Sequence, residues 1–457
     1  MPGRLLAAPK PAPAKAATLE AAEEDPLLDK GAGPSAQPPK LQVLLMTSFA
    51  FPMSVIWATM GMVVLPAEAL WLFPGDESLY LGLALGIVGI SQLICPAAGL
   101  VSDRHRSRWG RRRPFIFMGT LAAVVSIAGL WVSSVWRLPG LFFFFLFSSQ
   151  TALNVVYAAQ AAIVPDLYKS EKGEVSGMVS SLQLGGNLIG MFYVLCSAER
   201  DFHLTYGVYI VMLAVTGVLV CIASRERPTD KEPVKPFTWE AVRGSYWIDL
   251  EGERDFFWIF VGRTLFYMAT AFQTFIYYYM RDLMKVGNEA DIRSNLAVLA
   301  LIATLIGLGA SYPLGRMSDQ IGRKILVYMA CLCMGLAYAG YTICPLLGEK
   351  LGMHAVYMLG GLYGLGLGGY LSVDYALALD CLPEKHRGSS EALGLWGIAG
   401  FIGTSLGPMV GGVVLEATGG WGLGGHYGYH GYVILLLTGS SCCILAAYFT
   451  SLITKAK

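Results

Sequence analysis

Charged side chains are scarce in this sequence. Only 14% of its 457 residues are Asp, Glu, Lys or Arg, whereas soluble proteins carry about 25%. Ten of the charged residues fall in positions 1–40 and 14 in positions 224–255, so the rest of the chain is more apolar still. A hydrophobic content of 55% and a mean hydropathy of +0.54 exclude most classes of soluble protein. The sequence therefore predicts an integral membrane protein whose surroundings are a lipid bilayer.

Patterns of nucleic-acid binding, catalysis and metal binding are also lacking. The net charge is +1 and no basic stripe alternates with aromatic residues, so we expect no nucleic-acid partner. There is no nucleophile elbow, phosphate-binding glycine loop or zinc-type spacing. The nine cysteines lie in or at the ends of apolar segments, where we expect them to be packing residues. We therefore expect neither an enzyme nor a bound cofactor or metal.

Long apolar segments, by contrast, are abundant. A spanning helix needs about 20 mostly apolar residues, and polar or Pro/Gly-containing stretches separate twelve such segments. We place them at residues 45–70, 80–101, 114–135, 140–163, 176–196, 205–223, 256–283, 293–316, 324–346, 353–381, 389–416 and 430–453. The predicted fold class is an all-α membrane protein with twelve transmembrane helices.

The positions of Lys and Arg orient these helices. An even number of spans puts both termini on one side, and placing them in the cytosol leaves 26 of the 33 Lys and Arg residues in cytosolic segments. Six lie in the outer loops and one, Arg263, lies inside a helix. This asymmetry is the one expected of a membrane protein.

The chain divides into four predicted regions. Residues 1–40 are rich in Ala, Pro and Lys and are predicted to form a disordered cytosolic tail. Residues 224–255, charged and proline-containing, are the predicted linker between a six-helix bundle at 41–223 and another at 256–457. Within the tail, the sequence EEDPLL at 23–28 is similar to an acidic dileucine sorting signal, although such short patterns also arise by chance.

A repeated motif supports the two halves. The sequence GLVSD at 99–103 recurs as GRMSD at 315–319, a displacement of 216 residues, and the segments around Asp166 and Asp380 share nearly the same displacement. Two parallel six-helix halves are the arrangement expected of a rocker-type transporter. Both copies follow the second helix of their half, in a short cytosolic connection.

This motif resembles the signature loop of the major facilitator superfamily, and the resemblance covers nearly the whole chain after residue 40. The first copy is expanded to SDRHRSRWGRRRP at 102–114, which is similar to plant sucrose transporters, their animal relatives and bacterial glycoside-pentoside-hexuronide cation symporters. The resemblance implies a motif that locks the inner face until the halves tilt. The alternative is that the arginines only serve the positive-inside bias. The implied gating residues are Asp103, Arg104, Gly110, Arg111, Arg112, Arg113, Asp319, Gly322, Arg323 and Lys324.

The sequence also departs from these relatives. The sodium-coupled members use carboxylates in their second and fourth helices, whereas the second helix here offers only Gln92. The fourth helix offers Gln150, Asn154, Tyr157 and Gln160. We therefore do not expect sodium coupling of that type, and sucrose is one candidate substrate among others.

Two ionisable residues lie deep in predicted helices. Arg263 and Asp374 are each about seven residues from the cytosolic end of a helix, roughly 10 Å below the inner surface at 1.5 Å per residue. A charged side chain within the hydrocarbon core is energetically costly, so its presence there indicates a functional or structural role. We hypothesise that the two meet and that Asp374 takes and releases a driving proton, the alternative being a permanent structural salt bridge. Glu68 is a weaker candidate for proton coupling, because it lies near a helix end where a solvated carboxylate is ordinary.

Polar and aromatic residues mark a candidate cavity. The resemblance implies that helices 1, 4, 7 and 10 line it, and Arg263, Tyr267 and Thr270 fall on one stripe of helix 7. Amides, hydroxyls and aromatic faces suit a neutral polyhydroxyl solute, whereas the alternative is helix-to-helix hydrogen bonding. The candidate cavity residues are Asn154, Tyr157, Gln160, Tyr267, Thr270, Gln273 and Tyr370.

The sequence thus predicts a monomeric secondary transporter that moves a small-molecule solute, a sugar or glycoside, with a proton as the coupling ion. An uncoupled facilitator and a non-transporting receptor or scaffold on the same fold are the alternatives. We expect a multi-pass protein of the plasma membrane, or of an endomembrane, vacuole or lysosome if the dileucine-like pattern is used. Glycines 360, 364 and 368 form a repeated GxxxG pattern, which we expect to pack against a helix of the same half rather than to form a dimer seam.

Overall fold

The computed structural model describes residues 40–167, 172–198, 201–224, 254–381, 390–419 and 426–454. Within these ranges all the regular elements are helices. The dileucine-like pattern at 23–28, almost all of the predicted tail and almost all of the predicted linker lie outside the described residues.

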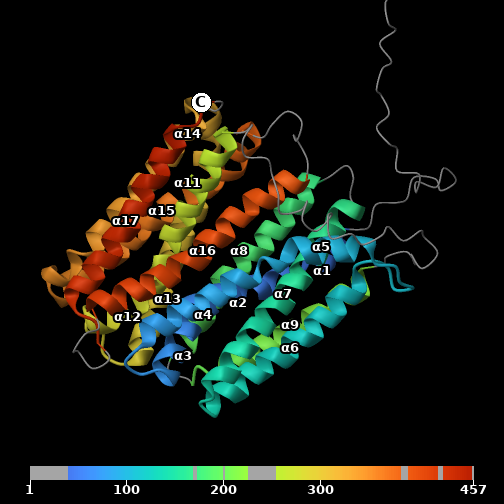
Figure 1. The fold of residues 1–457 in the computed structure, drawn as a ribbon, viewed down its shortest axis with the longest axis horizontal. Helices are drawn as coiled ribbons and strands as arrows, with labels where there is room; N and C mark the ends of the chain where they lie inside the picture. The colour runs from blue at the N-terminus through green and yellow to red at the C-terminus, as the bar shows by residue number, and fades with distance from the viewer. Residues whose placement is uncertain are drawn as a thin grey trace, which may run out of the picture. The chain divides into compact units, whose positions relative to one another are not determined.

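The first half contains helices up to residue 223 (Figure 1). Their bounds are α1 Lys40–Thr47, α2 Ala50–Thr59, the π-helix Met60–Val64, α3 Leu65–Leu72, α4 Glu77–Ser91, α5 Ile94–Arg104, α6 Arg113–Val135, α7 Pro139–Leu167, α8 Lys172–Cys196 and α9 Leu204–Ala223.

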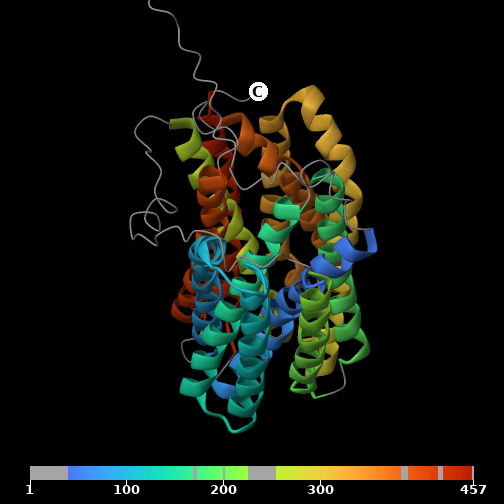
Figure 2. The ribbon, with the colours of Figure 1, turned by 90° about the vertical axis from the view of Figure 1, so that its right-hand side faces the viewer.

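The second half begins at residue 254. Its bounds are α11 Arg254–Ala271, the 3₁₀ turn Phe272–Phe275, α12 Ile276–Asp282, α13 Glu289–Ile321, α14 Arg323–Tyr341, a second 3₁₀ turn Cys344–Leu347, α15 Glu349–Cys381, α16 Ser390–Gly419 and α17 Tyr429–Ser451. Figure 2 shows the long helices of both halves running in roughly the same direction.

The predicted spans match these helices. In the described part of the chain, eleven helical segments are long and apolar enough to cross a membrane, from Leu41–Leu72 to Tyr429–Ser451, and each overlaps one predicted span. The remaining predicted span, 176–196, falls on α8, whose apolar part Leu182–Cys196 is shorter than the other eleven. The prediction of an all-α membrane fold is confirmed.

Each of three breaks in the first two spans lies just before a proline. Proline has no N–H and its ring clashes with the carbonyl four residues earlier, so it disrupts a helix one turn before itself. Pro52 follows the break between α1 and α2, Pro66 follows the π-helix Met60–Val64, and Pro96 follows the break between α4 and α5. Helix breaks at these points turn the side chains that follow them relative to an ideal helix.

The seventh span is broken without a proline. Thr270 lies just before its 3₁₀ turn Phe272–Phe275 and Thr274 lies within the turn, and both hydroxyls bond back to carbonyls of α11. The Thr270 hydroxyl donates to the Tyr267 carbonyl at 2.7 Å, and that of Thr274 donates to the Ala271 carbonyl at 2.6 Å. Such back-bonding bends helices.

The two halves meet mainly along two helix pairs, α4 with α16 and α8 with α13. In Figure 1, α4 and α16 run alongside each other where the blue-to-green and yellow-to-red helices meet. Glycine makes this contact close: a Cβ added at Gly82 would lie 2.5 Å from the Pro408 carbonyl oxygen, and one at Gly412 would lie 2.5 Å from that of Ser78. Backbone therefore packs directly on backbone between the halves.

The GxxxG pattern of α15 packs within its own half. A Cβ added at Gly364 would lie 2.1 Å from the Ala303 carbonyl oxygen, and one at Gly368 would lie 2.3 Å from that of Gly307. Ala303 and Gly307 both belong to α13. The expected packing against a helix of the same half is confirmed.

Candidate functional site

The two deep ionisable residues meet, as predicted. Arg263 on α11 donates from Nη1 to Oδ2 of Asp374 on α15. Their side chains are 8% and 6% exposed, so the ion pair is buried. The Arg263 guanidinium also lies 4.7 Å from the centre of the Tyr267 ring, and its Nη2 donates to the Tyr267 hydroxyl at 3.4 Å. The pair thus has an aromatic neighbour that can hold the arginine if Asp374 becomes neutral.

Aromatic rings continue from this ion pair. Tyr370 stacks on Phe266 with ring centres 3.4 Å apart, and it meets Tyr267 edge to face at 6.4 Å. Gly400 of α16 also lies close to the cluster, since a Cβ added there would be 3.4 Å from Nη2 of Arg263. The structure therefore brings Arg263, Asp374, Tyr267 and Tyr370 into one cluster in the second half.

The cavity candidates on the fourth predicted span, which is α7, do not join this cluster. Asn154 on α7 is buried and donates to the Ser91 hydroxyl at 3.0 Å, and Gln160 donates to the Met46 carbonyl at 3.2 Å. These are contacts to neighbouring helices of the same half, as in the helix-to-helix alternative. Tyr157 is half-buried and meets Trp57 edge to face at 5.7 Å.

Of the remaining candidates on helix 7, Thr270 has its hydroxyl bonded to its own helix. Gln273 lies within the 3₁₀ turn and is half-buried. The turn begins after Thr270, so the predicted stripe of Arg263, Tyr267 and Thr270 lies wholly on α11, whereas Gln273 does not share an ideal helical face with it.

Glu68 is not the solvated carboxylate that its place near a helix end suggested. It is 1% exposed on α3 and accepts hydrogen bonds from the Tyr206 hydroxyl at 2.6 Å and the Ser134 hydroxyl at 2.7 Å. The reason is that α6 and α9 cover it with these two side chains. Glu68 and Asp374 thus lie in different halves with separate partners.

Each copy of the gating motif contains a glycine with a positive φ. Gly110 has a φ of 97° and Gly322 one of 99°, values that glycine adopts without strain. Each lies just before the next helix, α6 or α14.

The arginines of the first copy make specific contacts. Arg112 donates to the Ser102 hydroxyl at 2.7 Å, and Arg113 donates to the Cys221 carbonyl at 2.6 Å. In the second copy, the Lys324 ammonium donates to the Ile453 carbonyl. Arg104, Arg111 and Arg323 also have interaction partners, whereas the side chains of Asp103 and Asp319 lie outside what the structure describes.

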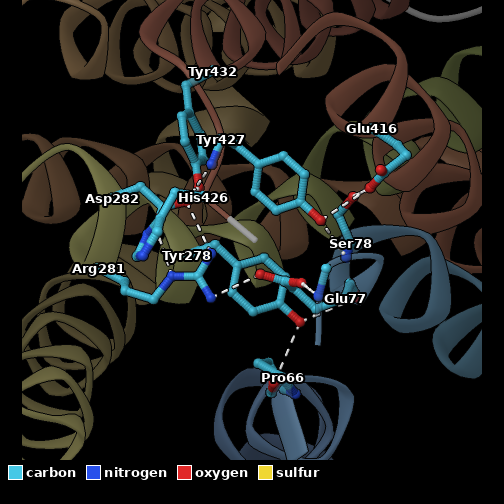
Figure 3. A network of polar contacts seen from close by, with 11 residues as sticks. Pro66, Glu77, Ser78, Tyr278, Arg281, Asp282, Glu416, His426, Tyr427 and Tyr432 are labelled. Carbon is cyan, nitrogen blue, oxygen red and sulfur yellow. Dashed lines mark hydrogen bonds and ion pairs between the residues drawn. The ribbon is translucent and has the colours of Figure 1, made fainter. Parts of the chain in front are cut away.

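A polar network joins the halves at the end that the Lys and Arg distribution assigns to the outside (Figure 3). Arg281 at the end of α12 forms an ion pair with Glu77 at the start of α4, with 2.8 Å between Nη1 and Oε1. The same guanidinium donates to both carboxylate oxygens of Asp282, at 2.5 and 3.1 Å. Glu77 is fully buried. We call this network, with the contacts below, the outer latch.

Hydrogen bonds extend the outer latch around the ion pair. The Tyr427 hydroxyl accepts from the Ser78 N–H at 2.9 Å, and the Ser78 hydroxyl donates to Glu416 at 3.1 Å. The Tyr278 hydroxyl lies 3.3 Å from the carbonyl oxygens of both Pro66 and Glu77. Figure 3 shows these side chains converging from both halves. The described outer ends of the halves are therefore locked together in this structure.

Comparison with known proteins gives the family. The model of the Major Facilitator Superfamily matches residues 44–408, which is most of the chain. The chain belongs to this superfamily. Its fold is shared with solved transporters at low sequence identity: the nucleoside transporter NupG superposes with a TM-score of 0.69 at 14% identity, covering 91% of this chain and all of NupG.

Curated relatives of this facilitator are also membrane transport proteins. The multi-drug resistance efflux pump PmrA of Streptococcus pneumoniae is 24% identical over 392 residues, covering 82% of this chain and 87% of PmrA. Human solute carrier family 45 member 3 is 37% identical over 89 residues, which are 19% of this chain and 16% of the human protein. The chain is a multi-pass membrane transporter, and its family and neighbours are transporters rather than enzymes.

Sequence reasoning missed the outer latch of this facilitator. Glu77 and Arg281 lie at helix ends, where charge is ordinary, and 204 positions separate them. One signal was present: Arg281 and Asp282 are adjacent charges at an apolar helix end, in outer segments that carry few Lys and Arg residues.

Proposed function

We propose that this facilitator moves a small polar solute, a sugar or glycoside, together with a proton, and that Asp374 is the proton acceptor. The expanded motif at 102–114 supports membership of the sucrose-transporter-like branch, as the sequence resemblance implies. The main support for coupling is the buried ion pair between Arg263 and Asp374, which adjoins the rings of Tyr267 and Tyr370.

The chemistry of this cluster fits an exchange of partners. When Asp374 is ionised, its attraction to Arg263 offsets part of the cost of burying both charges. When Asp374 takes up a proton, the guanidinium keeps its contact with the Tyr267 ring, which holds a cation without needing a counter-charge. The half-buried Tyr267 offers a ring and a hydroxyl that suit a sugar, whereas Tyr370 is buried behind it and stacked on Phe266.

A coupling mechanism follows from the position of the pair on two helices. Arg263 lies on α11 and Asp374 on α15, so a relative movement of these helices changes the distance between the charges. A longer distance weakens the attraction that favours the ionised carboxylate, and Asp374 then binds a proton more tightly. The state with separated partners would load the proton and the state with joined partners would release it.

The test is solute uptake into liposomes that contain the purified protein, with and without an inward proton gradient. We expect the gradient to accelerate wild-type uptake of the transported sugar, and the isosteric Asp374→Asn variant to be insensitive to the gradient. The control is Glu349→Gln, which removes an exposed carboxylate at the start of α15 and should keep the response. A panel of sugars, glycosides, nucleosides and cationic drugs identifies the solute class. An Asp374→Asn variant that responds to the gradient like wild type contradicts the assignment.

Uncoupled transport, in which the solute crosses without a proton, is the second candidate function, and a specific observation favours it. Both side chains of the ion pair are buried, and Tyr267 also bonds the arginine. This arrangement suits a permanent structural salt bridge. In that case uptake would ignore the proton gradient in wild type and variant alike. Asp374→Asn would then lower the melting temperature, because it leaves Arg263 as an uncompensated buried charge.

A further inference from the structure

The environment of Glu68 suits a group that changes its protonation state. Its two partners, the hydroxyls of Tyr206 and Ser134, lie 2.6 and 2.7 Å from its carboxylate oxygens. In the described part of the chain, Glu68 forms no ion pair with a lysine or arginine. A hydroxyl group can donate to a carboxylate or accept from a carboxylic acid, so Ser134 accommodates either form of Glu68.

A chain of hydrogen bonds leads from Glu68 to the outer surface. Ser134 Oγ lies 2.9 Å from Nε2 of His203, and Nδ1 of His203 lies 2.6 Å from Oδ1 of Asp201. The Asp201 side chain is 63% exposed and that of His203 is 10% exposed. The series Asp201, His203, Ser134 and Glu68 therefore runs from solvent into the buried end of α3 without a gap longer than a hydrogen bond.

The histidine ring is held in this series from several sides. Phe202 stacks on it at 4.1 Å and Trp71 meets it edge to face at 5.8 Å. The backbone N–H of His203 also donates to Oδ1 of Asp201 at 3.0 Å. Trp71 is fixed in turn by Arg137, whose guanidinium lies 3.9 Å from the centre of its ring.

Asp201 is suited to the outer end of the series. Partial burial acts to raise its pKa, but hydrogen bonds from the His203 backbone and ring, with the charges of His203 and Arg293, outweigh this and lower the pKa overall. The carboxylate therefore remains ionised down to acid pH. An ionised Asp201 accepts the Nδ1 proton and leaves Nε2 facing Ser134.

We propose that Asp201, His203 and Ser134 form a relay that loads Glu68 with a proton from the outer side, giving the first half a proton-binding site of its own. This proposal rests on the proposed function in one respect, namely that the loaded proton serves proton-coupled transport. It concerns residues of α3, α6 and the segment before α9, none of which contacts the Arg263 and Asp374 pair in the described structure.

Each proton in the relay can be followed from donor to acceptor. In the starting state His203 is an imidazolium that donates from Nδ1 to Asp201 and from Nε2 to Ser134, and Ser134 donates to the Glu68 carboxylate. His203 Nε2 then gives its proton to Ser134 Oγ while Ser134 gives its own proton to Glu68. The products are a neutral imidazole, an unchanged serine and a carboxylic acid. His203 then keeps its other proton on Nδ1, so the next loading step requires the ring to turn and take a proton from the outer side on its vacant nitrogen Nε2.

Other titratable groups surround the relay but do not interrupt it. Tyr206 of α9 bonds Glu68 on the side away from the relay, and its ring meets that of Tyr209 edge to face. Tyr80 of α4 lines a small pocket beside Glu68. Arg293 of α13 acts on Asp201 through its charge.

The order Asp201, His203 and Ser134 is also that of a hydrolase triad, but the burial argues against hydrolysis. Ser134 is fully buried and its hydroxyl is bonded to Glu68. A nucleophilic serine needs an accessible hydroxyl facing a substrate, so the residues suit proton transfer rather than acyl transfer.

The experiment follows Glu68 by infrared difference spectroscopy of the purified full-length protein in lipid nanodiscs, after rapid acidification and without solute. A protonated carboxyl group has a C=O stretching band, and the band that disappears in Glu68→Gln belongs to Glu68. We expect Ser134→Ala and His203→Gln to slow the appearance of this band by about 100-fold, the lower range for loss of a positioned proton-transfer group. The matched control is Thr205→Val, which changes a neighbouring hydroxyl that faces Tyr193 and should leave the rate unchanged.

Each remaining outcome overturns the proposal or separates it from the proposed function. A wild-type protein without a pH-dependent Glu68 band has no such proton-binding site. The two substitutions change different members of the relay, so the proposal requires each of them to slow the loading of Glu68. Loading rates equal to that of wild type in Ser134→Ala and His203→Gln contradict the relay. Normal loading with no solute transport contradicts the proposed function and leaves the relay standing.

Discussion

The outer latch makes a quantitative prediction about the equilibrium between closed and open outer ends. Glu77→Gln removes the carboxylate that pairs with Arg281 at 2.8 Å across the two halves. Arg281 keeps Asp282, so the charge is not left without a partner. The loss is therefore that of one close contact between buried opposite charges, about 1.5–3 kcal/mol if it matches a typical contact to a charged group. The closed state should lose about 10- to 100-fold in population relative to the open state.

The assay is a distance measurement across the outer mouth. Spin labels carried by non-natural amino acids at Trp136 and Leu346, both 70% exposed and in different halves, avoid the nine native cysteines. We expect Glu77→Gln to add a population at longer distance in double electron–electron resonance. The control Glu349→Gln removes an exposed carboxylate at the same end and should match wild type. An unchanged distribution in Glu77→Gln would refute the reasoning, because the ion pair would then not hold the halves together.

Three further changes test local parts of the structure. Gly82→Val places a Cβ 2.5 Å from the Pro408 carbonyl oxygen, so it should lower the melting temperature and shift the spin-label distances, whereas Gly185→Ala, with open space around it, should leave both unchanged. Gly322→Ala should cost about 1–3 kcal/mol because the residue has a φ of 99° and a ψ of 143°, a combination that residues other than glycine rarely adopt, and denaturant titration in detergent can measure this loss. Tyr267→Phe removes a hydroxyl but keeps the ring over Arg263, so solute affinity should fall while the response to a proton gradient persists; loss of that response would contradict the proposed role of the ring.

The helix positions could be predicted from sequence because the bilayer sets the length and polarity of each span. Helix α8 also falls on its predicted span, although its described apolar part is shorter than the others. The meeting of Arg263 and Asp374 was also predictable, because equal depth and opposite charge in hydrocarbon leave few alternatives. The breaks in the first two spans lie just before Pro52, Pro66 and Pro96, so they could be expected from the sequence.

Other features depend on contacts that no local pattern records. Glu68 looks like an ordinary carboxylate at a helix end, and only the approach of Ser134 and Tyr206 from other helices shows that it is buried. Asn154 has the spacing of a cavity residue, yet it bonds Ser91 of a neighbouring helix. Helical periodicity gives the face on which a side chain lies, but the packing of the helices decides what that face meets.

The central claim is that solute and proton cross the membrane together through a site that contains Asp374. The most direct measurement adds the transported solute to weakly buffered liposomes that contain the protein and follows the external pH, without any imposed gradient. The account predicts alkalinisation of the outer solution with wild-type protein and none with Asp374→Asn. Solute uptake by wild type without any change in external pH would contradict it.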